Sequence, residues 1–490
     1  MSLSRRRFIN TAAASTAALL GREGLLPLVA DAAHSAYQPK QMSSQKEVWD
    51  QQVWMAKLGP KYTGNPAHVE FVEFLAKSLT TAGLDVQREH YTFPRWDARR
   101  WEISIAPQSG PAFKPVVTSY FPYSGETTAA GVTGELVYAG SPGAFKLDGL
   151  QGKVALVDFK VNHRKFGEIY EPWGIYPSTA HFPADVHPAR GAVNDLTQFQ
   201  KAGAVGVILA WLDVSDANAA DQYTPFSRPP QGIPGLYVGK DTGAKLKAIA
   251  GTGAKATVVL EARTFPNTPT DTLIATLPGA NPDEVIIVNT HTDGPNATEE
   301  NGGIGVLALA TYFAKLPKSA RNRTLVFPLT SGHFAGPWVP SIRGVIQKYP
   351  DTIKKAVAAI TVEHLGCMEW LDNAQMQYKP TGEPEWSVAI TEMQTPGKVL
   401  VEALQGSGDR KTAVVNPVHG GWLGEGGSLA RAGIPTIGYI PQPNYLLAGP
   451  ANGCIEKLDA ALLHSQIEVF AKAIHKMDTL SAAELKAKNA

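Results

Sequence analysis

The feature that most restricts the fold of this chain is a series of short, mostly apolar segments between residues 271 and 477 that alternate with helical patterns. Residues 285–288 form one such segment, as expected for a strand that is buried on both faces of a sheet. Further strand and helix candidates follow along the chain: 324–327, 357–362 and 437–440 for strands, and 304–313 and 458–477 for helices. This alternation predicts a doubly wound α/β domain, in which ligands bind at the carboxyl ends of the strands.

Length, charge and cysteine content exclude several classes of protein. A chain of 490 residues exceeds the ~250–300 residues at which a single hydrophobic core stops growing, so we expect more than one domain. With 45 basic and 44 acidic residues there is no bulk field to attract nucleic acid, and no nucleic-acid partner is expected. Cys367 and Cys454 cannot build a disulfide scaffold, and the sequence leaves open whether they pair.

The N-terminus has the pattern of an export signal. Arg5, Arg6 and Arg7 precede a short apolar run at residues 11–20 and a small-x-small site, which is typical of a twin-arginine signal over residues 1–36. No later segment reaches the ~18 apolar residues that span a bilayer, so we expect no stable membrane insertion once the signal is removed. The sequence therefore predicts a periplasmic or secreted protein.

Residues 115–264 have the sequence pattern of short strands and turns. They separate the two parts of the α/β domain, residues 37–114 and residues 265–480. Three segments of this β-rich insertion resemble, in order, a protease-associated domain: 152–158, 200–209 and 233–246. The resemblance implies a non-catalytic lid or docking surface. Residues 162–190 exceed what such a domain needs, and we interpret them either as a packed surface loop or as a segment that overhangs an active site.

Polar side chains gather where the predicted strands of the α/β domain end. They lie in four segments: 289–294, 299–303, 330–333 and 363–364. Histidines and carboxylates that meet at one sheet edge suit zinc, manganese or a similar divalent ion. The alternatives are a hydrogen-bonded core position for His291, a favourable helix N-terminus for Glu299 and Glu300, and a backbone-bonded turn for His333.

The α/β parts of the chain resemble the co-catalytic zinc exopeptidases, a family that includes secreted bacterial aminopeptidases and glutamate carboxypeptidase. The resemblance rests on four segments: 57–64, 291–293, 432–435 and 455–459. It implies a doubly wound mixed sheet of the zinc exopeptidase type with the protease-associated domain inserted. It also implies a site for two zinc ions, with histidine and carboxylate ligands that include a bridging aspartate, and a neighbouring glutamate as general base.

Carried over by position, the resemblance implies that His291, Glu300 and Glu363 are metal ligands and that Asp293 orients the ring of His291. The glutamate that precedes Glu300 is the alternative at that position. If the strand at 357–362 stays regular, the side chains of Glu363 and His364 point to opposite faces, and we expect Glu363 to face the site.

The chain departs from the family pattern at two positions. Ser331 and Gly332 stand where the family has a Glu pair that supplies the base and a ligand, and residues 447–449 contain no histidine where the last ligand is expected. His333 is then the candidate for the general base or an extra ligand, because a neutral imidazole can do either. His419, in a glycine-rich loop, is the candidate for the missing ligand.

These observations predict an exported metallopeptidase-like hydrolase that cleaves an amide or related bond in a peptide or small amide substrate. We expect a divalent metal cofactor, zinc by preference, at a divergent site in which His333 and Asp293 are the catalytic candidates. The alternative is a non-catalytic peptide- or ligand-binding protein that keeps the fold. The sequence has no Gly-x-Ser-x-Gly nucleophile elbow and no Walker loop, and it carries no signal for an oligomeric state.

Overall fold

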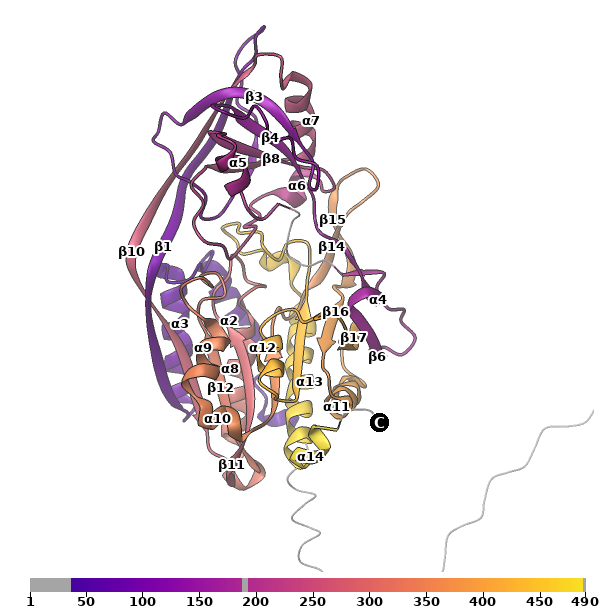
Figure 1. Cartoon of the computed structure of the whole chain (residues 1–490). Helices are drawn as coiled ribbons and strands as arrows, with labels where there is room; N and C mark the ends of the chain where they lie inside the picture. The colour runs from indigo at the N-terminus through magenta and orange to yellow at the C-terminus, as the bar shows by residue number, and fades with distance from the viewer. Residues whose placement is uncertain (1–36, 187–192, 488–490) are drawn as a thin grey trace, which may run out of the picture.

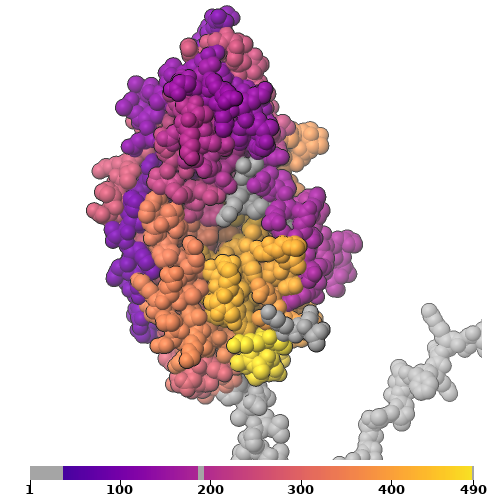
Figure 2. Space-filling model, in the orientation of Figure 1, coloured from indigo at the N-terminus to yellow at the C-terminus, as the bar shows by residue number. Residues whose placement is uncertain are grey.

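The computed structural model describes residues 37–186 and 193–487 of the chain. The predicted export signal, residues 1–36, lies outside the described residues. Among the described residues, no helix has both the length and the apolar character needed to cross a membrane. Figure 1 shows an upper and a lower part, and Figure 2 shows that the two parts pack into one elongated body.

One mixed sheet of 14 strands runs through both parts. Its path through the lower part is β10 (Lys255–Leu277), β12 (Arg323–Thr330), β11 (Asn281–His291), β13 (Ala356–Val362), β18 (Thr436–Pro441), β16 (Ser387–Ile390), β17 (Thr412–Pro417) and β6 (Tyr170–Tyr176). The strands β12, β11, β13 and β18 are parallel, whereas β10 and β16 run antiparallel to their neighbours β12 and β18. The predicted doubly wound mixed sheet is confirmed.

The parallel strands are buried on both faces because alternate side chains enter two different cores. Ile286 and Val288 of β11 enter one core, and Val285 and Ile287 enter the other. The first core lies under α2 (Gln45–Lys57), α3 (Pro66–Thr81), α8 (Gly302–Lys315), α11 (Gln394–Leu404) and α13 (Ala460–Thr479), and the second under α9 (Ser341–Lys348), α10 (Pro350–Lys355) and α12 (Gly426–Arg431). Helices on both faces are what the continuous apolar run at 285–288 predicts.

The upper part has two cores of its own on either side of its strands. Its path is β2 (Val117–Tyr120), β9 (Gly235–Val238), β8 (Gly206–Trp211), β4 (Val154–Phe159) and β3 (Val132–Gly140), which pairs with β10. Ala155 and Val157 of β4 share a core with α5 (Thr197–Lys201), whereas Val154 and Leu156 share a core with α7 (Lys240–Ile249). The insertion is thus a layered unit with its own apolar interior.

A long ribbon of two antiparallel strands connects the two parts. It consists of β1 (Asp85–Ala106) and β10, and Figure 1 shows it along one side of the molecule. At one end, residues 255–258 of β10 pair with β3, and at the other end residues 273–277 pair with β12. The two parts are therefore joined by continuous backbone hydrogen bonds and not by flexible linkers.

The segment from 162 to 186 leaves the upper part and returns to the lower sheet. Its β6 pairs antiparallel with β17, and the short elements β5 (Arg164–Lys165), α4 (Phe166–Ile169) and β7 (Asp185–Val186) accompany it. Asn162, Arg164 and Ile169 also line a cavity at the carboxyl edge of the sheet. Up to residue 186 this segment packs against the sheet and borders that cavity, whereas residues 187–190 lie outside the described residues.

The remaining short elements complete the two parts. They are α6 (Asp216–Ala219), the hairpin β14 (Met368–Asp372) and β15 (Tyr378–Pro384), α14 (Ala482–Leu485), and the 3-10 helices η1 (Pro39–Gln41), η2 (Lys318–Ala320) and η3 (Ile455–Lys457). Cys367 precedes β14 and Cys454 precedes a short 3-10 turn, and both are buried. The two thiols are not joined in a disulfide.

Candidate metal centre

The carboxyl ends of the central strands and the start of α8 meet at one edge of the lower sheet. β11 ends at His291, β13 ends one residue before Glu363, and Glu299 lies in the turn before α8. At Gly302, the first residue of α8, an added Cβ would lie 2.0 Å from Thr290 Oγ1 and 2.3 Å from the Val362 carbonyl oxygen. Glycine alone permits this close approach, which holds the turn with Glu299 over the strand ends.

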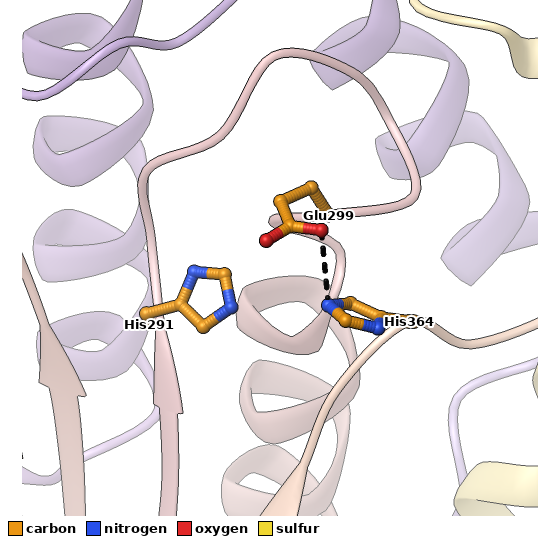
Figure 3. Close-up of side chains that lie close together, drawn as sticks. All are labelled: His291, Glu299 and His364. Carbon is orange, nitrogen blue, oxygen red and sulfur yellow. Dashed lines mark ion pairs between the residues drawn. The ribbon is translucent and has the colours of Figure 1, made fainter. Parts of the chain in front are cut away.

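His291, Glu299 and His364 form a buried group that could hold a metal ion. One ligand atom of each residue lies within 4.8 Å of the ligand atoms of the other two. Figure 3 shows the two imidazoles and the carboxylate converging, with His364 Nε2 3.2 Å from Glu299 Oε2. Glu363 adds a second carboxylate, whose Oε2 lies 3.8 Å from His291 Nε2 and 3.9 Å from His364 Nε2.

Both imidazole rings are oriented by a backbone carbonyl. His291 Nδ1 lies 3.0 Å from the carbonyl oxygen of Asp293, and His364 Nδ1 lies 2.8 Å from that of Pro441. A carbonyl oxygen only accepts, so each Nδ1 carries the proton and donates it. When the ring is neutral, Nε2 presents its lone pair to the centre of the group, which is the tautomer that metal-binding histidines adopt. Burial lowers the pKa of His364, but the charge and hydrogen bond of Glu299 outweigh it and raise that pKa above its usual value, so a cation that binds here displaces a proton from His364 Nε2.

The atoms that face the centre have no hydrogen-bond partner of suitable geometry among the described residues. They are His291 Nε2, His364 Nε2, Glu299 Oε2 and Glu363 Oε2. Buried polar atoms without partners cost stability, and several such atoms around one point are rare without a ligand. Two nitrogen and two carboxylate donors suit a divalent cation such as zinc, so the residues present fit a metal.

Burial sets the charge of these groups before any cation binds. It lowers the pKa of His291 to about 4, and the neighbouring His333 adds to the effect, so the ring is neutral near pH 7. It raises the pKa of Glu363 to about 7. Burial also raises the pKa of Glu299, but His364, with His291 and His333, outweighs burial and lowers that pKa below its usual value. A neutral imidazole and an ionised carboxylate are the forms that bind metal.

Glu300, the predicted ligand at this position, is engaged elsewhere. Its Oε1 lies 2.6 Å from Nζ of Lys61, and both side chains are fully buried. Lys61 also donates hydrogen bonds to the carbonyl oxygens of Met55 and Gly59, which fixes the ammonium group. Burial raises the pKa of Glu300 to about 7 although Lys61 opposes the shift. Successive side chains of the turn point in different directions, and Glu299 is the one that meets His291 and His364.

Glu363 and His364 both reach the site, so the expectation that only Glu363 faces it is wrong. β13 ends at Val362, and His364 has a φ of 59°, in the left-handed region. The strand alternation on which the expectation depended therefore stops before these two residues. A left-handed residue directly after a strand leaves no periodic signal in the sequence.

Asp293 supports the site differently from the prediction. It orients His291 through its backbone carbonyl oxygen, whereas its carboxylate accepts hydrogen bonds from the hydroxyl of Thr63 and from the backbone N–H groups of Gly332, His333 and Phe334. The carboxylate thus fixes the loop that carries His333.

His333 lies against the metal-binding group and is held by a second acid, Glu425. Its ring stacks on that of His291 with centroids 4.1 Å apart, and its Nε2 lies 3.7 Å from Glu299 Oε1. Its Nδ1 lies 3.0 Å from Glu425 Oε1. Burial lowers the pKa of His333, but the hydrogen bond and charge of Glu425 outweigh it and raise the pKa to about 9.

Glu425 was not predicted from the sequence. In the glycine-rich loop, His419 was the predicted candidate for the missing ligand. His419 is exposed, however, and lines neither of the two cavities described below. The acid in the same loop is the residue that enters the site, where Ser341 Oγ and the Ile342 N–H also donate to it. A lone acid next to glycines gave no signal, because its partners come from distant segments.

Two cavities meet at His333. The metal-side pocket, of about 430 Å³, is lined by Glu299, Glu363 and His364 together with apolar side chains that include Ile169, Trp422 and Leu446. The arginine pocket, of about 230 Å³, is lined by residues that include Arg228, Arg343, Ser341, Ser428 and Glu425. Phe226, His333 and Gly424 line both, so the two pockets adjoin at these residues.

No protein-family model and no curated protein matches the chain. Among solved structures, it is similar to a peptidase M28 precursor from Shewanella amazonensis SB2B, with a TM-score of 0.65 and 17% identity over 94% of this chain and 98% of that one. It is also similar to BSAP, a zinc aminopeptidase from Bacillus subtilis (TM-score 0.58, 16% identity, 90% and 97% covered), and to an aminopeptidase from Aneurinibacillus sp. strain AM-1 (TM-score 0.58, 18% identity, 91% and 95% covered). The chain therefore has the fold of the zinc exopeptidases, as the sequence resemblance implied.

Proposed function

We propose that this chain is a metal-dependent hydrolase that cleaves an amide bond in a peptide or small amide substrate. The observation that carries the proposal is the pair of buried histidines, His291 and His364, whose Nε2 atoms converge on Glu299 without hydrogen-bond partners of suitable geometry among the described residues. The zinc-aminopeptidase fold of the similar structures supports it.

His291, Glu299 and His364 would hold the ion, with Glu363 as a further ligand. Compared with the ligands predicted from the sequence, Glu299 replaces Glu300, and His364 is added beside Glu363. A divalent ion at such a site polarises a substrate carbonyl group and lowers the pKa of a water molecule. The burial of the group excludes bulk water and strengthens every charge interaction within it.

His333 takes the role that the absent Glu pair leaves open. Its Nδ1–H donates to Glu425, so the proton that can be gained or released sits at Nε2, the atom that faces Glu299. An imidazole held by a carboxylate on one nitrogen and open on the other is the arrangement of a general acid or base. The Asp293 carboxylate holds the loop in place through the His333 backbone N–H.

The proposal also covers the organisation of the chain. Residues 1–36 would be a twin-arginine export signal that delivers the protein to the periplasm or beyond, and residues 115–264 would be a protease-associated domain. The order of segments 152–158, 200–209 and 233–246 supports the domain assignment.

The metal content of the purified protein tests the proposal. We expect at least one zinc per chain by mass spectrometry, together with hydrolysis of short peptides that a chelator abolishes and zinc restores. His291→Ala should lose both metal and activity, whereas the matched control His419→Ala, at an exposed position, should keep both. A wild-type protein that neither retains nor takes up zinc would instead indicate a non-catalytic binding protein.

A further inference from the structure

A third cavity, of about 350 Å³, lies where the β1–β10 ribbon, the upper part and the loop after β12 meet. It shares no lining residue with the two pockets at His333. Its lining includes three large aromatic side chains, Trp96, Tyr123 and Trp338, and we call it the aromatic pocket. The ring centroid of Tyr123 lies 5.7 Å from that of Trp96 and 5.2 Å from that of Trp338, with the planes inclined by 30° and 42°. Three rings from different segments thus gather around one cavity.

The wall that carries Tyr123 is fixed by backbone contacts. The Gln231 N–H donates to the carbonyl oxygen of Tyr123, and the Gly125 N–H donates to that of Ile233. At Gly125 an added Cβ would lie 2.6 Å from the Ile233 nitrogen, so the two segments touch. Tyr123 itself has a φ of 56°, a strained conformation of the kind that gathers at ligand sites. The pocket is therefore preformed, and a ligand need not order these segments.

The polar groups of the aromatic pocket leave one open charge. Glu126 is exposed, and its carboxylate forms no ion pair or hydrogen bond with another residue of the described ranges. The Gln231 amide is engaged, since it accepts from the Leu196 N–H and donates to the Pro229 carbonyl oxygen. Ser124 Oγ likewise accepts from the Gly235 N–H. The pocket thus offers aromatic surface and a free carboxylate.

The arginines of the ribbon lie on its other face. Trp96 pairs with Thr264, and both line the pocket. The paired residues on either side of them face the opposite way, since side chains alternate along a strand. There Arg95 and Arg263 lie over the ring of Phe265, with centroid distances of 4.4 and 4.6 Å. Their positive charge is therefore directed away from the aromatic pocket.

We propose that the aromatic pocket binds a quaternary ammonium group, of the kind that choline carries. The faces of aromatic rings attract a cation, and quaternary ammonium ligands are recognised by such groups of rings. A primary ammonium group would bring three N–H donors that need acceptors, whereas a quaternary group brings none. The exposed carboxylate of Glu126 balances the positive charge of the ligand. This binding site is separate from the metal centre and does not depend on the hydrolase function.

Choline and dimethylbutanol, its neutral isostere with carbon in place of nitrogen, test the proposal because they differ only in charge. Nuclear magnetic resonance titration of their methyl protons with the purified full-length protein gives both Kd values. We expect the Kd of choline to be at least about fivefold lower, because cation–π contacts with several rings are worth roughly this factor.

Variants of the pocket locate the binding. Glu126→Gln, at an exposed position, should raise the Kd of choline at least about threefold, and Trp338→Leu at least about fivefold. The matched controls are Glu70→Gln on α3 and Trp101→Leu on β1, both exposed and outside the pocket. Both controls should keep the wild-type Kd within about twofold.

The outcomes are distinct from those that test the hydrolase function. Equal Kd values for choline and dimethylbutanol, or no binding of choline, would overturn the proposal. A choline Kd that neither Glu126→Gln nor Trp338→Leu changes would place the binding elsewhere and overturn it as well. Flotation with phosphatidylcholine vesicles separates two sources of the ligand. Flotation that Trp338→Leu abolishes would assign the pocket to a lipid headgroup, and choline binding without flotation would assign it to a free cation, so either result supports the site.

Discussion

At the level of single residues, Glu299 and Glu300 are chemically identical neighbours in opposite environments. Glu299 faces two histidines whose Nε2 atoms have no hydrogen bond of suitable geometry within the described part of the chain, and Glu300 faces the buried ammonium group of Lys61. Glu299→Gln should reduce the zinc content of the purified protein at least tenfold, because it removes the charged ligand, while Glu300→Gln should keep it. Mass spectrometry of both variants checks the prediction.

The cost of Glu300→Gln should appear in stability instead. Removing one partner of a buried ion pair leaves the other charge uncompensated and costs about 3–5 kcal/mol. We expect a lower melting temperature for this variant, and a partial recovery in the double variant with Lys61→Met. If Glu300→Gln lost zinc while its melting temperature stayed unchanged, Glu300 would be the metal ligand, as the sequence predicted.

Glu425 gives His333 its unusual protonation. The hydrogen bond and charge of Glu425 raise the pKa of His333 to about 9 against the effect of burial. In Glu425→Gln only burial and weaker neighbours remain, so the pKa of the ring should fall by about two or more pH units. Nuclear magnetic resonance titration of labelled histidine in the metal-free protein measures the shift. A His333 signal that titrates alike in both proteins would refute the coupling.

At the level of elements, the loop before α12 is shaped by contact with the site. Gly424 has a φ of 67°, and an added Cβ would lie 2.6 Å from Glu363 Oε1, while Glu425 N–H donates to that same oxygen. Gly424→Ala should therefore displace the Glu363 carboxylate and weaken zinc binding about tenfold or more. Chelator competition measures the affinity.

Gly420 in the same loop is a matched control. It has a φ of 73°, but an added Cβ would meet no atom of residues 37–186 and 193–487 within 4 Å. Gly420→Ala carries a similar backbone strain without the collision, so zinc affinity should change less than twofold. Equal losses in the two variants would mean that backbone strain, and not contact with Glu363, sets the effect.

The sequence predicts most elements of the sheet but not all of the site. Apolar-rich runs identify β11, β12, β13 and β18, because burial on both faces enriches these strands in apolar residues. The choice between Glu299 and Glu300 depends on the buried Lys61, which lies over two hundred positions away in the chain. The approach of His364 depends on one left-handed residue, which has no periodic signature.

At the level of the whole molecule, the β1–β10 ribbon makes one body of two parts. Alternation predicts strands at 86–93 and at 101–106, but Pro94 and the charged residues that follow hide their continuity. The register shifts only between Phe93 and Arg95 and between Ala98 and Arg100, so the strand continues through the interruption. Because the upper part also supplies Phe226 to both pockets, its position relative to the lower sheet affects the shape of both.

The folded protein should lose stability in mild acid because of His475, a residue outside the candidate metal centre. His475, buried on α13, has a pKa lowered by burial to about 4 from the ordinary 6.5, and its Nε2 lies 2.7 Å from the Tyr312 hydroxyl group. Between these two pH values the unfolded chain binds a proton that the folded chain does not, so stability is lost as pH falls from 6.5 toward 4. One such group contributes up to about 3 kcal/mol of folding free energy.

Urea unfolding of chelator-treated protein at pH 7 and pH 4.5 measures the loss of stability. The loss should be smaller in His475→Gln and unchanged in the exposed control His419→Gln. An equal acid sensitivity of His475→Gln and wild type would exclude His475 as a source of this pH dependence.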